Sequence, residues 1–146
     1  MAAIRMTQAS ALGVPAIRAL FLRAIVANKI PYPEGTILEL QHRIGEEALG
    51  IWVGTDGWKA CGVCVAALPT SNFMVAPQVF MAYNEGPARV CREVIAAVRE
   101  WISEYKFEEL IGCNRSDAPD AVWLRAFKTA GAPSQVGTAY KFSWRE

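Results

Sequence analysis

The chain has 146 residues and a net charge of +1, with 53% hydrophobic and 20% charged residues. This composition excludes a disordered chain, and the length is that of one compact domain, so a single domain over residues 1–146 is expected. The near-zero net charge gives no global field that would attract nucleic acid or an anionic membrane surface, and neither is expected as a partner.

The N-terminal third of the sequence predicts a short strand followed by two helices. Ala3 to Thr7 has strand character, and Ser10 to Asn28 carries an apolar stripe at helical spacing. The segment Pro31-Tyr32-Pro33 favours an extended backbone, and a weaker helical pattern covers Gly35 to Glu47. The first helix is expected to pack on a sheet.

The middle of the sequence predicts an antiparallel hairpin and a third strand. Ala48 to Val53 and Trp58 to Leu68 are apolar runs joined by Gly54-Thr55-Asp56-Gly57, whose Asp-Gly pair favours a tight turn. Phe73 to Tyr83 is the third strand, and Pro77 within it cannot donate a ladder hydrogen bond. A bulge or an edge is therefore expected at Pro77, with a bend in the strand.

The remaining elements alternate helix and strand. Ala88 to Tyr105 has the clearest amphipathic pattern, and Glu109 to Cys113 predicts a short buried strand. Ser116-Asp117 starts a helix that ends before Gly131, and Gly137 to Trp144 predicts a closing strand. The order β-α-α-β-β-β-α-β-α-β indicates an α/β fold, a mixed sheet with helices on both faces.

The four cysteines raise the question of a metal or redox site. Cys61-Gly62-Val63-Cys64 has CxxC spacing but lies in a predicted strand, where residues three apart point to opposite faces. The single histidine, His42, has no second ligand at a suitable spacing. Residues 1–10 lack the apolar segment of a secretory signal. We therefore expect a cytoplasmic protein with no metal, whose cysteines pack as small apolar side chains.

The stretch Ala82 to Arg89, "AYNEGPAR", joins the third strand to the amphipathic helix and has two interpretations. The first turn of a helix has N–H groups without partners and a partial positive charge, which suit a phosphate. A Gly-Pro pair is also an ordinary helix start. Glu85 and Pro87 favour a simple start, because a carboxylate repels a pyrophosphate and proline has no N–H. Both interpretations stay open at this point.

The element order, with the opening IRMTQAS and the closing FKTAGA and GTAYKF, resembles the GNAT superfamily of N-acetyltransferases over nearly the whole chain. The resemblance implies that acetyl-CoA enters a gap where a bent central strand splays from its neighbour. It further implies that the following helix takes the pyrophosphate on its N-terminus. These elements would be Phe73 to Tyr83 and Ala88 to Tyr105.

The resemblance also implies site residues. The family's cofactor loop has the pattern Q/R-x-x-G-x-G/A, and Tyr83 stands here in place of the leading Gln or Arg. The general-acid tyrosine of the family's Y-x-x-x-G-F pattern is replaced by Phe127, so no catalytic residue is assigned. The implied cofactor contacts are Tyr83, Asn84, Gly86, Ala88, Arg89 and Asn114.

Two functions follow from this resemblance. The first is a transferase that moves acetyl from acetyl-CoA to a small amine, although no general acid or base is evident. The second is a GNAT-fold protein without a working cofactor site, serving as a structural or interaction module. The chain is also similar to short GNAT-like proteins of tailed phages, through REWISEYKFEELIGCN and GTAYKF, which implies a virion-associated component. Trp58 and Trp144 are candidates for contact with a protein partner or a second copy.

Overall fold

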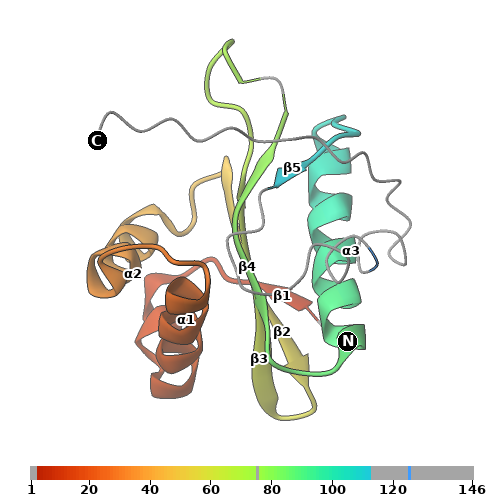
Figure 1. Cartoon of the computed structure of the whole chain (residues 1–146). Helices are drawn as coiled ribbons and strands as arrows, with labels where there is room; N and C mark the ends of the chain where they lie inside the picture. The colour runs from red at the N-terminus through yellow and green to blue at the C-terminus, as the bar shows by residue number, and fades with distance from the viewer. Residues whose placement is uncertain (1–2, 75, 113–124, 126–146) are drawn as a thin grey trace, which may run out of the picture.

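In a computed structural model, residues 3–74, 76–112 and 125 are described, and their strands form one sheet in the order β1-β2-β3-β4-β5 (Figure 1). Strands β1 to β4 pair antiparallel, whereas β5 runs parallel to β4. Helices α1 and α2 lie on one face of this sheet and α3 on the other (Figure 1). The expected mixed α/β sheet with helices on both faces is therefore confirmed. The elements are β1 (Ala3–Arg5), η1 (Ala9–Gly13), α1 (Pro15–Ala27), α2 (Pro33–Arg43), β2 (Leu49–Asp56), β3 (Lys59–Ala67), β4 (Gln78–Asn84), α3 (Ala88–Glu104) and β5 (Ile111–Gly112).

The single helix expected over Ser10 to Asn28 is divided at Val14. Val14 has an extended backbone (φ −65°, ψ 123°) between the 3-10 turn η1 and helix α1. Pro15 explains the break, because the residue before a proline is disfavoured in the helical region while proline itself fits the first helical turn. The prediction of one continuous helix was therefore wrong, although α1 buries Phe21 and Ile25 against the sheet as expected.

The β2–β3 hairpin is confirmed, with a tighter turn than expected. Strand β2 extends through Asp56, and the chain reverses at Gly57, whose φ of 61° suits a residue without a side chain. The register passes from Gly54 opposite Gly62 to Thr55 opposite Ala60. One residue of β3, Cys61, is therefore extra and forms a β-bulge.

The bend expected in the third strand is present, but its position at Pro77 was wrong. Strand β4 begins after Pro77, and its register with β3 passes from Val65 opposite Met81 to Ala66 opposite Val79. The extra residue is Phe80, which makes the bulge. The carbonyl of Pro77 accepts a hydrogen bond from the N–H of Ile111 at 2.9 Å.

The sheet separates two apolar clusters. On the α1 and α2 face, the helices pack on the odd-numbered residues of β2, including Ile51 and Val53. On the other face, α3 packs closely because Gly54 has no side chain: a Cβ there would lie 2.6 Å from Val94 Cγ2. Strand β5 begins later than the expected Glu109 and is less buried than expected, with Ile111 44% exposed. The predicted helix after Ser116 and the strand from Gly137 lie outside the described residues, apart from a helical Arg125.

Candidate functional site

Strand β4 has an edge that β5 covers only at its beginning in the described residues. Strand β5 pairs with Gln78 and Val79, and no described residue pairs with the later part of this edge. The N–H of Glu85 donates to the Cys61 carbonyl on β3 at 2.9 Å. Because an antiparallel ladder alternates between groups that face the partner and groups that face away, Ala82 and Asn84 direct their backbone N–H and C=O toward the open edge.

Asn28 connects the end of α1 to this open edge. It caps α1 and is the one buried polar residue in the described part of the chain. Its amide nitrogen donates to the carbonyls of Ala24 at 2.9 Å and Ala82 at 3.0 Å. The second bond agrees with an Ala82 carbonyl that faces away from β3. The sequence indicates Asn28 only as a helix-ending residue, since asparagine is common at such ends, and gives no sign of its contact with β4.

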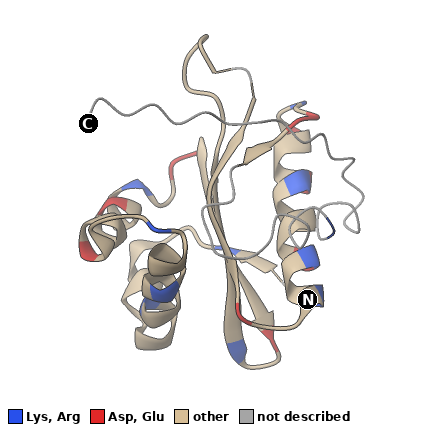
Figure 2. Cartoon of the chain, in the orientation of Figure 1, with Lys and Arg blue, Asp and Glu red and all other residues tan. Residues whose placement is uncertain are grey.

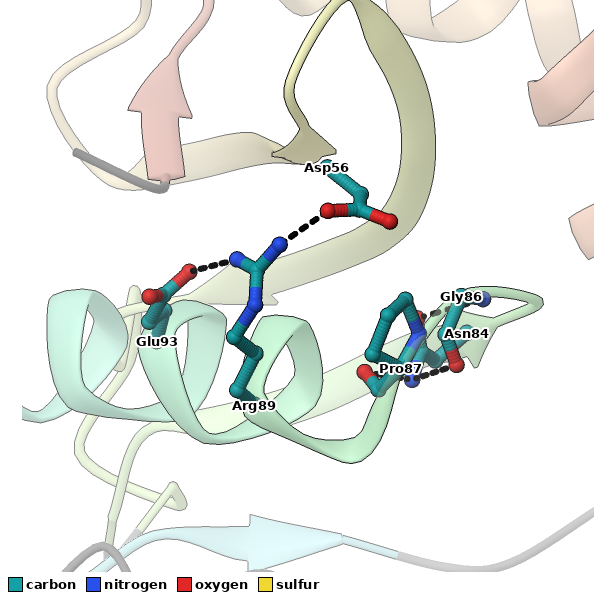
Figure 3. Close-up of polar contacts among 6 residues, drawn as sticks. All are labelled: Asp56, Asn84, Gly86, Pro87, Arg89 and Glu93. Atoms are coloured by element: carbon teal, nitrogen blue, oxygen red, sulfur yellow. Dashed lines mark hydrogen bonds and ion pairs between the residues drawn. The ribbon is translucent and has the colours of Figure 1, made fainter.

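The loop after β4 is shaped by the side chain of Asn84 (Figure 3). Its amide oxygen accepts a hydrogen bond from the N–H of Gly86 at 3.1 Å, and its nitrogen donates to the carbonyls of Gly86 and Pro87 at 3.2 and 3.1 Å. These bonds form an Asx turn. The side chain of Asn84 therefore orders the loop, and its backbone is the part that faces the open edge.

Gly86 is small because it packs against a neighbour within the protein. A Cβ on Gly86 would lie 2.4 Å from Cys61 Sγ and 3.0 Å from Cys61 Cβ. The Cys61 bulge of β3 thus fills the space beneath the loop. The glycine that the family pattern associates with a ligand has a packing role here, whatever else it contacts.

Helix α3 begins directly after this loop. Pro87 is the N-cap residue (φ −59°, ψ 154°), and the N–H groups of Ala88 and Arg89 belong to the first turn, where no acceptor exists within the helix. The Arg89 guanidinium pairs with Asp56 at the end of β2 and lies 3.8 Å from Glu93 Oε2 (Figure 3). Two carboxylates therefore neutralise the Arg89 side chain, and the backbone amides remain to receive an anion.

Glu85 is neutralised on the α1 side of the loop. Arg23 of α1 donates from Nε and Nη2 to its two carboxylate oxygens at 2.9 and 2.6 Å, and the Tyr83 hydroxyl donates at 2.8 Å. The bonds from Arg23 lower the pKa of Glu85, whereas burial and the bond to Glu85 raise the pKa of Tyr83. The carboxylate that appears unfavourable for pyrophosphate in the sequence is therefore paired with a cation from a distant segment.

This ion pair predicts a pH-dependent effect of Glu85→Gln. Because the native pKa of Glu85 lies below its ordinary value of 4.5, the ionised carboxylate stabilises the fold above that pH. The stabilisation is lost as the pH falls through the native pKa. Glu85→Gln is expected to melt at a lower temperature than the parent at pH 7, with the difference closing below about pH 4.5. Melting curves from pH 2 to 8 measure this, with Glu104→Gln as an exposed carboxylate control; a difference independent of pH would contradict it.

The two cysteines of the CxxC segment, Cys61 and Cys64, are free, and their side chains do not point as expected. Cys61 and Cys64 pack in the same apolar cluster beside α3, so the expectation of opposite faces was wrong, because the bulge at Cys61 interrupts the strand alternation. Burial raises the pKa of Cys64 to about 12. The described residues contain no group of three His, Cys, Asp or Glu side chains placed to hold a metal, and His42 is exposed.

The tryptophans and the remaining predicted residues lie in different parts of the chain. Trp58 is fully exposed at the β2–β3 turn, whereas Trp52 and Trp101 pack edge to face in the core with ring centres 5.0 Å apart. Asn114, Phe127 and Trp144 lie outside the described residues. No helix in the described ranges combines the length and apolar character needed to cross a bilayer.

Comparisons with known proteins relate this fold to acetyltransferases. No family model and no curated sequence matches. Among solved structures, a probable acetyltransferase matches with a TM-score of 0.71 and 14% identity, covering 100% of this chain and 99% of its own. The aminoglycoside N-acetyltransferase AAC(6')-Iy in complex with CoA matches at 0.66 and 13%, covering 98% and 94%. An aminoglycoside acetyltransferase from an uncultured soil metagenomic sample, bound to sisomicin, matches at 0.61 and 18%, covering 97% and 95%. The chain therefore has a GNAT-type acetyltransferase fold.

Proposed function

We propose that this chain binds acetyl-CoA along the open edge of β4 and the first turn of α3, and transfers the acetyl group to a small amine. One observation carries the proposal: among the described residues, the edge that opens after Val79 leads along β4 to the amides of Ala88 and Arg89, which have no acceptor within α3. An extended ligand with amide groups can pair with the N–H of Ala82 and with the backbone of Asn84, as an added strand would, while the Ala82 carbonyl accepts from Asn28. CoA has such an arm, followed by a pyrophosphate suited to a helix N-terminus.

The charged side chains of the loop and of the first turn of α3 are all paired, which supports this assignment. A pyrophosphate beside an unpaired carboxylate would be repelled, but Glu85 is held by Arg23 and Tyr83 on the α1 side. Arg89 is similarly occupied by Asp56. The site therefore relies on backbone N–H groups and the helix dipole for the phosphates, which explains why the family's leading Gln or Arg can be absent at Tyr83.

The reaction needs little from the protein beyond positioning. The amine nitrogen attacks the carbonyl carbon of the thioester, the C–S bond breaks, and CoA leaves as a thiol with a proton released by the amine. The Tyr83 hydroxyl already donates to Glu85 and is not assigned as the acid. Holding the amine and the thioester together supplies a large rate factor without a dedicated acid or base.

Thermal denaturation in the presence of CoA tests the proposal. A ligand that binds only the native state raises the melting temperature in a saturable way. We expect such a rise with CoA and acetyl-CoA, and none with pantothenate, which lacks the pyrophosphate. The absence of any rise at millimolar CoA would refute the proposal.

A binding role is the second candidate, favoured by two large exposed aromatic side chains. Trp58 and Phe73 are 104% and 96% exposed and lie on separate loops. Aromatic residues of this kind often anchor protein interfaces. This alternative, including a virion-associated component, becomes the preferred one if CoA does not bind.

A further inference from the structure

A cavity lies on the α2 side of the sheet, apart from the apolar cluster beside α3. Its volume is about 260 Å³, and its floor is apolar, with Leu40, Leu49, Phe80 and Met81 among the lining residues. Ligand pockets for drug-sized molecules start at about 300 Å³. This cavity therefore suits a smaller ligand, the size of a single amino acid.

The cavity has one carboxylate and one guanidinium in its described lining. Glu39 and Arg43 are four residues apart on α2, so they lie on the same side of the helix. Figure 2 shows that α2 carries charges of both signs. Glu39 is exposed and forms no ion pair with another residue of the described chain, while Arg43 contacts Glu46 through Nε at 3.3 Å. Within residues 3–74 and 76–112, the terminal nitrogens of Arg43 make no ion pair, and two such nitrogens can bind a carboxylate in a bidentate manner.

The cavity also reaches the place where β4 leaves β5. Phe80 is the bulge residue of β4, and the strand pairing with β5 ends at the preceding residue, Val79. A ligand in the cavity would therefore lie next to the beginning of the open edge. This is where an acceptor must meet a thioester that enters between the two strands.

We infer that this cavity holds the acceptor, and that the acceptor is an α-amino acid with an apolar side chain, its amine at Glu39 and its carboxylate at Arg43. The inference rests on the proposed function, because it names the acceptor of that transfer. An apolar floor fits the side chain, and one charge of each sign fits a zwitterion. A polycation such as sisomicin would face the positive Arg43 and would gain only one carboxylate in this lining.

Calorimetric titration of the full chain tests the inference. The probes are L-leucine, isopentylamine (leucine without its carboxylate), 4-methylpentanoate (leucine without its amine) and sisomicin. Leucine is expected to bind at least about tenfold more tightly than either truncated analogue, since one charged contact is lost in each. Glu39→Gln is expected to remove the advantage over 4-methylpentanoate, and Arg43→Gln the advantage over isopentylamine.

The exposed ion pair between Arg18 of α1 and Glu34 of α2 supplies the controls, because it offers one residue of each charge and neither lines the cavity. Arg18→Gln and Glu34→Gln are expected to keep the preference for leucine. Equal binding of leucine and its analogues, tighter binding of sisomicin, or the same loss in the controls would overturn the inference.

The same preparations are titrated with CoA, which separates the two proposals. CoA binding without the leucine pattern refutes the acceptor assignment and leaves the proposed function standing. The leucine pattern without CoA binding supports the cavity as an amino-acid site and refutes the transferase.

Discussion

Replacing Ala88 by proline is expected to weaken CoA binding by about tenfold to a hundredfold while leaving the fold intact. Ala88 is the first residue of α3, where proline is well tolerated, and Pro87 before it has the extended backbone (φ −59°, ψ 154°) that a following proline requires. The substitution removes one N–H from the proposed pyrophosphate site. A hydrogen bond to a charged group contributes about 1.5–3 kcal/mol, which corresponds to this range of affinity.

Isothermal titration with CoA measures the effect, and Ala88→Ser is the matched control because it keeps the N–H. The control is expected to bind CoA within about threefold of the parent. This change in affinity is well below the loss expected when one hydrogen bond to a charged group is removed. Equal affinity of the proline variant and the parent, with the melting temperature unchanged, would show that the first turn of α3 does not contact the coenzyme.

Gly86→Ala is expected to destabilise the protein by about 1–3 kcal/mol, the usual cost of forcing an extra group into a packed site. The new Cβ would lie 2.4 Å from Cys61 Sγ, so the loop or the β3 bulge must move. Since φ at Gly86 is not in the left-handed region, the contact alone produces the effect. Urea denaturation measures the loss of unfolding free energy.

Cys61→Ala tests whether the contact with Cys61 destabilises Gly86→Ala, because it removes the sulfur that the new Cβ would meet. In the Cys61→Ala background, Gly86→Ala is expected to cost less than in the parent, and the difference is the coupling energy of the pair. Gly13→Ala is the control, since a Cβ at Gly13 would meet nothing within 4 Å. Additive losses from Gly86→Ala and Cys61→Ala would contradict the packing explanation.

Elements with a regular apolar period were predictable from the sequence. Helix α3 occupies nearly the expected residues, because its buried positions from Val90 to Ile102 repeat at helical spacing. The β2–β3 hairpin was likewise indicated by two apolar runs and an Asp-Gly pair. These signals are local, so one segment of sequence contains all of the information.

Features that depend on strand register were not predictable. The bulges at Cys61 and Phe80 each add one residue to a strand, and apolar runs without alternation do not reveal which residue is extra. The wrong orientation of the two cysteines and the wrong position of the β4 bend both follow from this. The break at Val14 was missed for a different reason. The apolar helical period continues across Pro15, but the proline forces the residue before it into an extended conformation.

The sequence predicted where the loop lies between β4 and α3, but not the contacts that its side chains make. The loop from Tyr83 to Ala88 does join β4 to α3, but Asn84 orders the loop and Gly86 packs against Cys61. The partner of Glu85 is Arg23, 62 residues away in the sequence, and such a contact has no local signal. Asn28 and Ala82 are likewise far apart in the sequence, by 54 residues.

Titration with CoA followed by ¹H–¹⁵N NMR correlation spectra tests most directly whether CoA binds at the β4 edge and the start of α3, because the amide shifts report both binding and its location. We predict saturable shifts centred on the backbone amides of Ala82, Asn84, Ala88 and Arg89, with the amide of Phe73, in the loop before the opposite end of β4, unaffected. No saturable shift at millimolar CoA, or shifts confined to residues away from the β4 edge and the start of α3, would contradict it.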